Sequence, residues 1–122
     1  MKARKRYTYG YKNDAVRLHI KSPQSILSIP AYVCRQLFNC WDDLNIETDI
    51  IELDVENNVI QITPALCSSK FTFVLCTNGS GAGRKVTIPA YIVKEFDLTD
   101  GYFKADVLKD GTLHVDLKER LK

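Results

Sequence analysis

Apolar and polar residues alternate in several short stretches of the chain, which is the pattern of strands with one buried face. The first stretch begins near Ala15, and its apolar members alternate with basic and imidazole side chains. Residues 22–24, with the sequence Ser-Pro-Gln, favour a turn. A second short strand follows and ends at Pro30. The pattern therefore predicts two strands joined by a tight turn.

Pro30 predicts the start of a helix, because the first helical turn does not need the N–H group that proline lacks. Ser28 is the candidate cap, and we expect the helix to run from about Pro30 to about Trp41 or a little beyond. Two apolar stripes at helical spacing overlap, one of Cys34, Leu37, Phe38 and Trp41, the other of Val33, Leu37, Cys40 and Leu44. So wide an apolar face predicts a well-buried helix, with Trp41 and Phe38 in the core.

A hairpin is predicted after this helix. Ile51, Leu53 and Val55 alternate with acidic residues, and Asn57-Asn58 forms a two-residue turn because asparagine tolerates a positive φ angle. The returning strand covers residues 59–62, and Pro64 ends it.

The same order of elements then occurs a second time. A strand at 71–75, a glycine-rich loop at 78–83, a strand at 85–88 and a shorter helix from Pro89 to near Phe96 precede a hairpin. This hairpin pairs residues 102–108 with 112–117 around Asp110-Gly111, and residues 118–122 are predicted to be a charged tail. Pro30 and Pro89 lie 59 positions apart, and the two hairpin turns lie 53 apart, so the first helix or its exit loop is six residues longer. Such internal similarity indicates a tandem repeat.

The repeat defines the expected domain organisation. Residues 1–13 form a basic arm, residues 14–65 the first repeat and residues 66–122 the second, and both repeats are expected to form one compact domain. The fold class is mainly β with short helices (α+β). The chain of 122 residues is 45% hydrophobic and 26% charged, with a net charge of +2, which permits a nucleic-acid partner without requiring one. The arm carries Arg4, Lys5 and Arg6; it either binds phosphates or is a solvated terminus.

Residue types that would support catalysis or metal binding lack the required spacing. The four cysteines do not form the close pairs of zinc sites, and we expect small core residues instead. His19 and His114 are expected to face outward on strands, without a cysteine partner. The loop before Lys85 lacks the Gly-Lys-Ser/Thr end of a phosphate-binding loop, and the acidic stretch after Trp41 does not match a calcium loop. We therefore expect no enzyme activity, no cofactor, no metal and no small-molecule substrate.

The chain shows no secretory signal and no apolar run long enough to span a membrane. We therefore expect a cytoplasmic, reducing location and no membrane partner.

The repeated unit resembles the AbrB/SpoVT (AbrB/MazE/MraZ-like) swapped-hairpin DNA-binding family. The second copy is the closer match, with Gly83-Arg84-Lys85-Val86-Thr87-Ile88-Pro89-Ala90-Tyr91-Ile92-Val93-Lys94 followed by Leu98-Thr99-Asp100-Gly101 and the Asp110-Gly111 turn. The resemblance covers most of residues 15–117. It implies that the two units exchange hairpins and form one pseudo-dimeric barrel. A single unit of this size buries too little surface to be stable alone, which is a physical reason for such pairing.

The resemblance also implies where DNA would bind. In the family, basic residues lie beside the strand that leads to Ile-Pro and on the first helical turn. The matching or neighbouring residues here are Arg84, Lys85, Lys94, Arg35, Arg17 and Lys21, together with Arg4, Lys5 and Arg6 of the arm. Ser25 and Ile26 stand in the first copy where Arg84 and Lys85 stand in the second, so the first copy departs from the family pattern.

Two functions remain open from the sequence. The first is a DNA-binding transcription regulator that contacts double-stranded DNA and is nucleoid-associated in the cytoplasm. The second is a non-enzymatic protein–protein interaction module or inhibitor that keeps the barrel without operator binding, with a homo-oligomer or another protein as its partner. The basic second copy favours the first function, and the neutral contact positions and acidic helix exit of the first copy favour the second.

Overall fold

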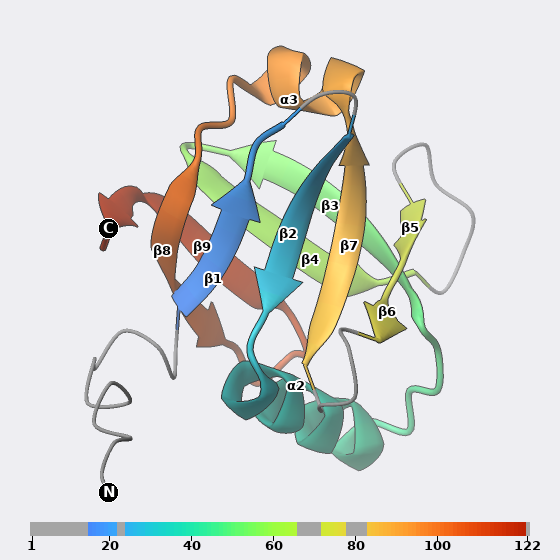
Figure 1. Ribbon diagram of the computed structural model, residues 1–122. Helices are drawn as coiled ribbons and strands as arrows, with labels where there is room; N and C mark the ends of the chain where they lie inside the picture. Colours follow the sequence, from blue (N-terminus) through green and yellow to red (C-terminus); the bar gives the residue numbers. More distant parts are fainter. Residues whose placement is uncertain (1–14, 22–23, 66–71, 78–82, 122) are drawn as a thin grey trace, which may run out of the picture.

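The computed structural model describes residues 15–21, 24–65, 72–77 and 83–121. Within these residues a single nine-stranded antiparallel sheet curls into a nearly closed barrel, and two helices cover its ends (Figure 1). The strands are β1 (Ala15–His19), β2 (Gln24–Ile29), β3 (Ile50–Glu56), β4 (Val59–Pro64), β5 (Thr72–Val74), β6 (Cys76–Thr77), β7 (Arg84–Pro89), β8 (Gly101–Val107) and β9 (Leu113–Arg120). The helices are α2 (Ala31–Asp43) and α3 (Ala90–Phe96). Neither of these helices has the length and apolar character needed to cross a membrane.

One short segment brings the two edges of the sheet together. The strand order is β5-β3-β4-β9-β8-β1-β2-β7-β6, so β5 and β6 stand at opposite edges. These two strands are nevertheless separated in the chain only by Leu75, which is buried and whose N–H donates to the carbonyl of Asp49. The segment bonds to β3 on one side and to β7 on the other, and this nearly closes the barrel.

Each hairpin pairs with a strand from the other half of the chain. The β3–β4 hairpin bonds to β5, and the β8–β9 hairpin bonds to β1. Two further ladders join the halves, β2 with β7 and β4 with β9. In the first ladder Leu27 pairs with Val86, 59 positions later, and in the second Gln61 pairs with His114, 53 positions later. These are the same two offsets that separate the prolines and the hairpin turns in the sequence.

The barrel interior is filled by the inward-facing residues of the strands. Alternate residues of β1, β2, β4 and β7 are almost completely buried, and the residues between them are partly or fully exposed. His19 is exposed and His114 partly so, which confirms that both lie at outward positions. The cysteines differ from one another: Cys34 is buried as expected, but Cys76 is exposed, and Cys67 lies outside the described residues. The expectation that the cysteines are core residues is therefore wrong for Cys76.

Helix α2 begins and ends differently from the sequence expectation. Its N-cap is Pro30, with extended backbone and no side-chain cap, because Ser28 still belongs to β2. The indole N–H of Trp41 donates to the carbonyl of Gly111 at 2.8 Å, and this joins the end of α2 to the β8–β9 hairpin. Leu44 is 44% exposed rather than buried, since the helix ends at Asp43 before completing the second apolar stripe.

The shorter helix α3 and the two hairpin turns follow the sequence expectation closely. Pro89 precedes α3, which ends at Phe96 with Asp97 in the left-handed conformation. Asn57 and Asn58 both have positive φ angles, 54° and 63°, as a tight hairpin turn requires. The predicted charged tail is wrong, because residues 118–120 belong to β9 and Arg120 pairs with Phe103.

Candidate nucleic-acid interface

One wall of the barrel, formed by β1, β2 and β7, carries basic side chains and no acidic residue in its strands. Arg17 on β1 and Lys85 on β7 are both paired in register with Ser28 of the strand between them. Adjacent strands lie about 4.8 Å apart, so the Arg17 and Lys85 backbones are about 10 Å apart across the wall. We call this wall, with Arg17, Ser28, His19, Lys85 and Thr87 at outward positions, the basic face.

Arg17 is held in place on the basic face by an aromatic neighbour. Its guanidinium carbon lies 5.4 Å from the ring centre of Tyr102, which stands opposite it on β8. The Nε atom of Arg17 is shielded from solvent and finds no hydrogen-bond partner within the described part of the chain. The aromatic ring restricts the guanidinium without changing its charge. Binding a phosphate therefore costs little side-chain entropy.

A second basic group lies where β7 begins beside α2. The guanidinium carbon of Arg84 lies 5.3 Å from the ring centre of Phe38, and its Nη1 donates to the carbonyl of Gly83 at 3.0 Å. Burial raises the pKa of the Cys34 thiol, while Arg84 and Arg35 nearby act in the opposite direction. We call Arg35 and Phe38 of α2, together with Arg84 of β7, the α2 end of the basic face.

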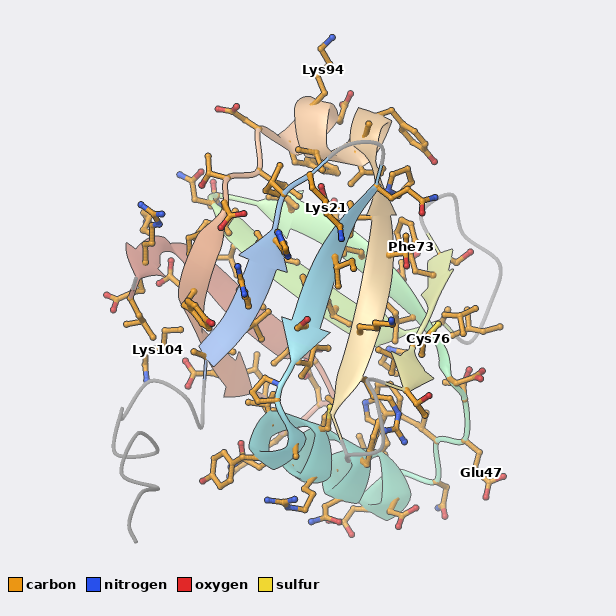
Figure 2. All side chains as sticks on the ribbon, in the orientation of Figure 1. Lys21, Glu47, Phe73, Cys76, Lys94 and Lys104 are labelled. Atoms are coloured by element: carbon orange, nitrogen blue, oxygen red, sulfur yellow. The ribbon has the colours of Figure 1, made fainter. Side chains whose placement is uncertain are left out.

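The corresponding place beside α3 has different chemistry. Lys21, Ser25, Lys94 and Asp97 line a hollow of about 420 Å³, together with apolar residues of α3. The Ser25 side chain is buried, and its hydroxyl accepts from the Lys21 N–H at 3.2 Å and faces the Lys21 carbonyl at 3.3 Å. Lys94 extends away from the barrel (Figure 2). We call this group the α3 end of the basic face.

One strand of the opposite wall of the barrel, β3, is acidic. Glu52, Asp54 and Glu56 follow one another at alternate positions of β3, which has no basic residue. This strand lies behind the basic face (Figure 1). The basic face therefore attracts polyanions more strongly than the surface around β3 does.

The structure divides the residues proposed from the sequence into three groups. Arg17 and Lys85 lie in the middle of the basic face, Arg84 and Arg35 at the α2 end, and Lys21 and Lys94 at the α3 end. The two ends lie on opposite sides of the barrel, next to α2 and α3 (Figure 1). Arg4, Lys5 and Arg6 lie outside the described residues.

Sequence reasoning missed the two aromatic residues that position the arginines. The sequence predicts Tyr102 only as a strand residue and Phe38 as a core residue. Phe38 is partly buried, and its ring centre lies 5.6 Å from that of Trp41. The alternation of β8 indicates that Tyr102 faces outward. Its pairing with Arg17 of β1, 85 positions earlier, cannot be recognised from the local sequence.

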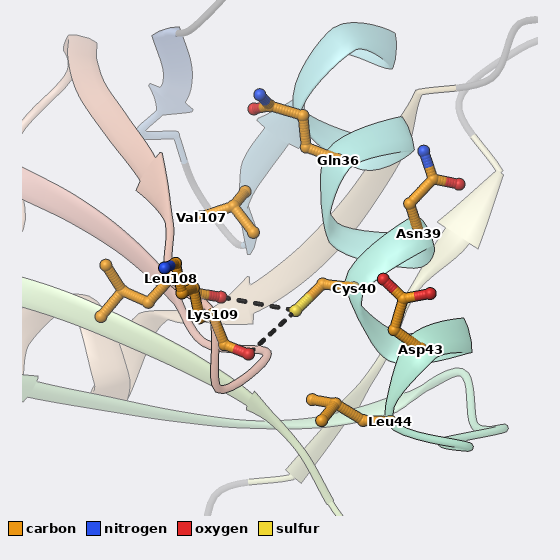
Figure 3. A pocket seen from close by; sticks show the side chains of 8 residues that line it. All are labelled: Gln36, Asn39, Cys40, Asp43, Leu44, Val107, Leu108 and Lys109. Carbon is orange, nitrogen blue, oxygen red and sulfur yellow. Dashed lines mark hydrogen bonds between the residues drawn. The ribbon is translucent and has the colours of Figure 1, made fainter.

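Other hollows on the surface are less suited to a polyanion. One of about 500 Å³ lies between α2 and the β8–β9 hairpin, where the Cys40 thiol faces the carbonyls of Leu108 and Lys109 at 3.5 and 3.3 Å (Figure 3). Asp43 also lines it. Across residues 15–21, 24–65, 72–77 and 83–121, no group of three or more metal-ligating side chains comes together.

No protein-family model, curated protein or solved structure matches this chain.

Proposed function

We propose that this protein is a DNA-binding transcription regulator of the AbrB-like type, in which one chain forms the pseudo-dimeric swapped-hairpin barrel. The observation that carries the proposal is the basic face: Arg17 and Lys85 flank Ser28 on strands that contain no acidic residue. Its cations neutralise phosphates, which supplies the sequence-independent part of DNA affinity.

The strand pairing supports the family part of the proposal. Each hairpin bonds to the first strand of the other half of the chain, which is the exchange that the family resemblance implies. In an internal two-fold repeat, equivalent residues of the two halves pair with each other across the axis. Leu27 pairs with Val86 and Gln61 with His114, at the repeat offsets of 59 and 53 positions. The two strands that lead to Ile-Pro lie next to each other, antiparallel, within the basic face, and the two Ile-Pro segments stand at its opposite ends.

The test is fluorescence anisotropy with a random-sequence DNA duplex over a series of salt concentrations. We expect tight binding at low salt that weakens steeply as salt rises, because binding releases counterions. Arg17→Ala and Lys85→Ala should each lower the slope of log affinity against log salt by about one unit. Lys118→Ala is the matched control, since Lys118 is exposed on β9, outside the basic face, and should leave the slope unchanged.

The proposal fails if the protein does not bind the duplex at low salt, or if Lys118→Ala weakens binding as much as Lys85→Ala does. The double variant Arg84→Ala with Lys94→Ala tests the two ends of the face, and unchanged affinity would exclude both ends as DNA contacts. All variants are first checked for wild-type thermal melting, so that weak binding is not misfolding.

A protein–protein interaction module is the second candidate, and one surface feature favours it. Ile50 and Val74 are paired on β3 and β5, and both are exposed beside the acidic positions of β3. An apolar pair bordered by charge suits a protein partner better than a nucleic acid. A pulldown from lysate with wild type and with Val74→Lys tests it: a protein lost only in the variant supports this function, and recovery of nucleic acid alone contradicts it.

A further inference from the structure

One exposed side chain is the same in both halves of the chain. The sequence Ile29-Pro30-Ala31-Tyr32 occurs again as Ile88-Pro89-Ala90-Tyr91, 59 positions later, at the end of a strand and the first turn of a helix. Folding explains the isoleucines, which are buried, and the prolines, which begin the helices. It does not explain the tyrosines, because Tyr32 is 45% exposed and Tyr91 is 64% exposed.

Each tyrosine has a basic residue beside it on the outer side of its helix. Residues three apart on a helix are neighbours on its surface, so Tyr32 lies next to Arg35, and Tyr91 lies next to Lys94. All four side chains are exposed, and neither helix has an acidic residue in its first turn. A neutral hydroxyl donor and a cation therefore stand side by side at both the α2 end and the α3 end of the basic face.

The two tyrosines border the basic face because the helices follow directly on its strands. Pro30 comes after the last residue of β2, and Pro89 is the last residue of β7. In the β2–β7 ladder Pro89 pairs with Gln24, six positions before Pro30, so at about 3.3 Å per strand residue the two helices begin about 20 Å apart. Each strand of a DNA duplex has one phosphate about every 3.4 Å along the axis, and this span therefore corresponds to about six base pairs.

The hydrogen bonding of the Tyr32 hydroxyl leaves its proton available for a ligand. The hydroxyl oxygen accepts from Nε2 of Gln36 at 3.5 Å, so its own O–H group can donate to an acceptor outside the protein. On α3 the position of Gln36 is taken by Glu95, whose side chain is exposed. A carboxylate there repels a phosphate, and we therefore expect the contact of Tyr91 to be the weaker of the two.

We propose that Tyr32 and Tyr91 hold one DNA duplex at both ends of the basic face at the same time, each donating its phenolic hydroxyl to a backbone phosphate. This inference rests on the proposed DNA-binding function. The contact does not depend on base sequence, because phosphate oxygens are the same at every base pair. A neutral donor also displaces no counterion, so it adds affinity without adding salt dependence, unlike the neighbouring Arg35 and Lys94.

The experiment measures the affinity for two duplexes of unrelated sequence by fluorescence anisotropy, over a series of salt concentrations. Tyr32→Phe and Tyr91→Phe each remove only the hydroxyl, and each should weaken binding to both duplexes by about three- to tenfold, with the larger loss for Tyr32→Phe. The double variant should weaken binding by the product of the two factors, because distant contacts with the same duplex add in free energy. The slope of log affinity against log salt should keep its wild-type value in all three variants.

The charged neighbours of the tyrosines provide the matched variants. Arg35→Gln and Lys94→Gln should each lower the slope of log affinity against log salt by about one unit. Glu95→Gln makes the α3 end resemble the α2 end, and we expect it to raise the affinity and to enlarge the loss caused by Tyr91→Phe. All the substituted side chains are exposed, so each variant should melt like the wild type, and its melting curve is recorded before binding is measured.

The contrary outcomes separate the inference from the function on which it rests. If one tyrosine substitution leaves the affinity unchanged while Lys85→Ala weakens binding, the contact at two ends is wrong and DNA binding remains. A small loss in both single variants with a large loss in the double variant means that the duplex uses one end at a time, which also overturns the inference. A loss on only one of the two duplexes assigns the tyrosines to base reading instead. Failure of the wild type to bind any duplex at low salt overturns the proposed function and the inference together.

Discussion

The contact between Trp41 and Gly111 allows a quantitative test of how α2 is attached to the barrel. Trp41 is the only tryptophan in the chain, is 3% exposed, and donates its indole N–H to the Gly111 carbonyl at 2.8 Å. The substitution Trp41→Phe keeps an aromatic ring at this position but removes the donor. Since Gly111 is itself buried, its carbonyl loses a partner that water cannot readily replace.

The expected cost of Trp41→Phe has two parts. A buried acceptor left without its partner costs about 1 to 3 kcal/mol. The smaller ring also removes buried apolar atoms, at about 0.8 kcal/mol for each methylene equivalent. We therefore expect the free energy of unfolding to fall by about 2 to 4 kcal/mol. For a chain of this size that corresponds to a melting temperature lower by roughly 10 °C.

Urea unfolding followed by far-UV circular dichroism measures this loss, because the variant has no tryptophan fluorescence. Tyr91→Phe is the control: Tyr91 is 64% exposed, and removing its hydroxyl should change the free energy of unfolding by less than about 0.5 kcal/mol. Hydrogen exchange adds a local readout, since the last turn of α2 should lose protection first. A loss below about 0.5 kcal/mol for Trp41→Phe would refute the idea that this contact fixes the helix.

Four further measurements test the packing of the barrel. Gly111→Ala should lower the free energy of unfolding by about 1 to 2 kcal/mol in urea titrations, because Gly111 has a φ angle of 87° and an added Cβ would lie 3.1 Å from the neighbouring indole. Leu27→Ala, at a fully buried position in the β2–β7 ladder, should cost about 2 to 5 kcal/mol, whereas Leu108→Ala, at an exposed position, should cost less than about 0.5 kcal/mol. Thiol labelling with peptide mapping should modify the exposed Cys76 readily and Cys34 only on unfolding. Burial raises the pKa of Cys34 above its ordinary value of 9.0, because the folded protein disfavours the thiolate. The contribution of Cys34 to stability is therefore complete below about pH 9 and falls above it. Urea unfolding midpoints of the wild type and of Cys34→Ala, measured over a series of alkaline pH values, test this.

The local elements of the fold are predictable because short-range chemistry determines them. Asn57, Asn58 and Gly111 supply positive φ angles for the turns, and the structure has both hairpins there. Pro30 and Pro89 start helices because their fixed φ angle suits the first turn. The wrong details lie at element ends. Ser28 cannot act as a cap while its backbone takes part in β2.

The pairing of distant strands was not predictable from pattern alone. Residues 118–120 have the composition of a charged tail, yet they extend β9 because β8 offers a partner there, with a register shift between Phe103 and Lys104. The same reason limits the prediction of the site. The basic residue types were recognisable in the sequence, but the ring of Tyr102 beside Arg17 comes from a strand that only the closed sheet brings near.

Corresponding positions of the two halves are alike inside the barrel and different on its surface, and this contrast bears on function. Leu27 with Val86 and Ile62 with Val115 are fully buried apolar pairs at the two repeat offsets, because the shared interior restricts residue size and polarity. Ile26 and Lys85, at outward positions of β2 and β7 and also 59 positions apart, stand under no such restriction. Differences concentrated at surface positions change what the barrel contacts without changing how it folds. A two-fold scaffold whose outward residues differ between its halves thus presents different chemistry at related places on its surface.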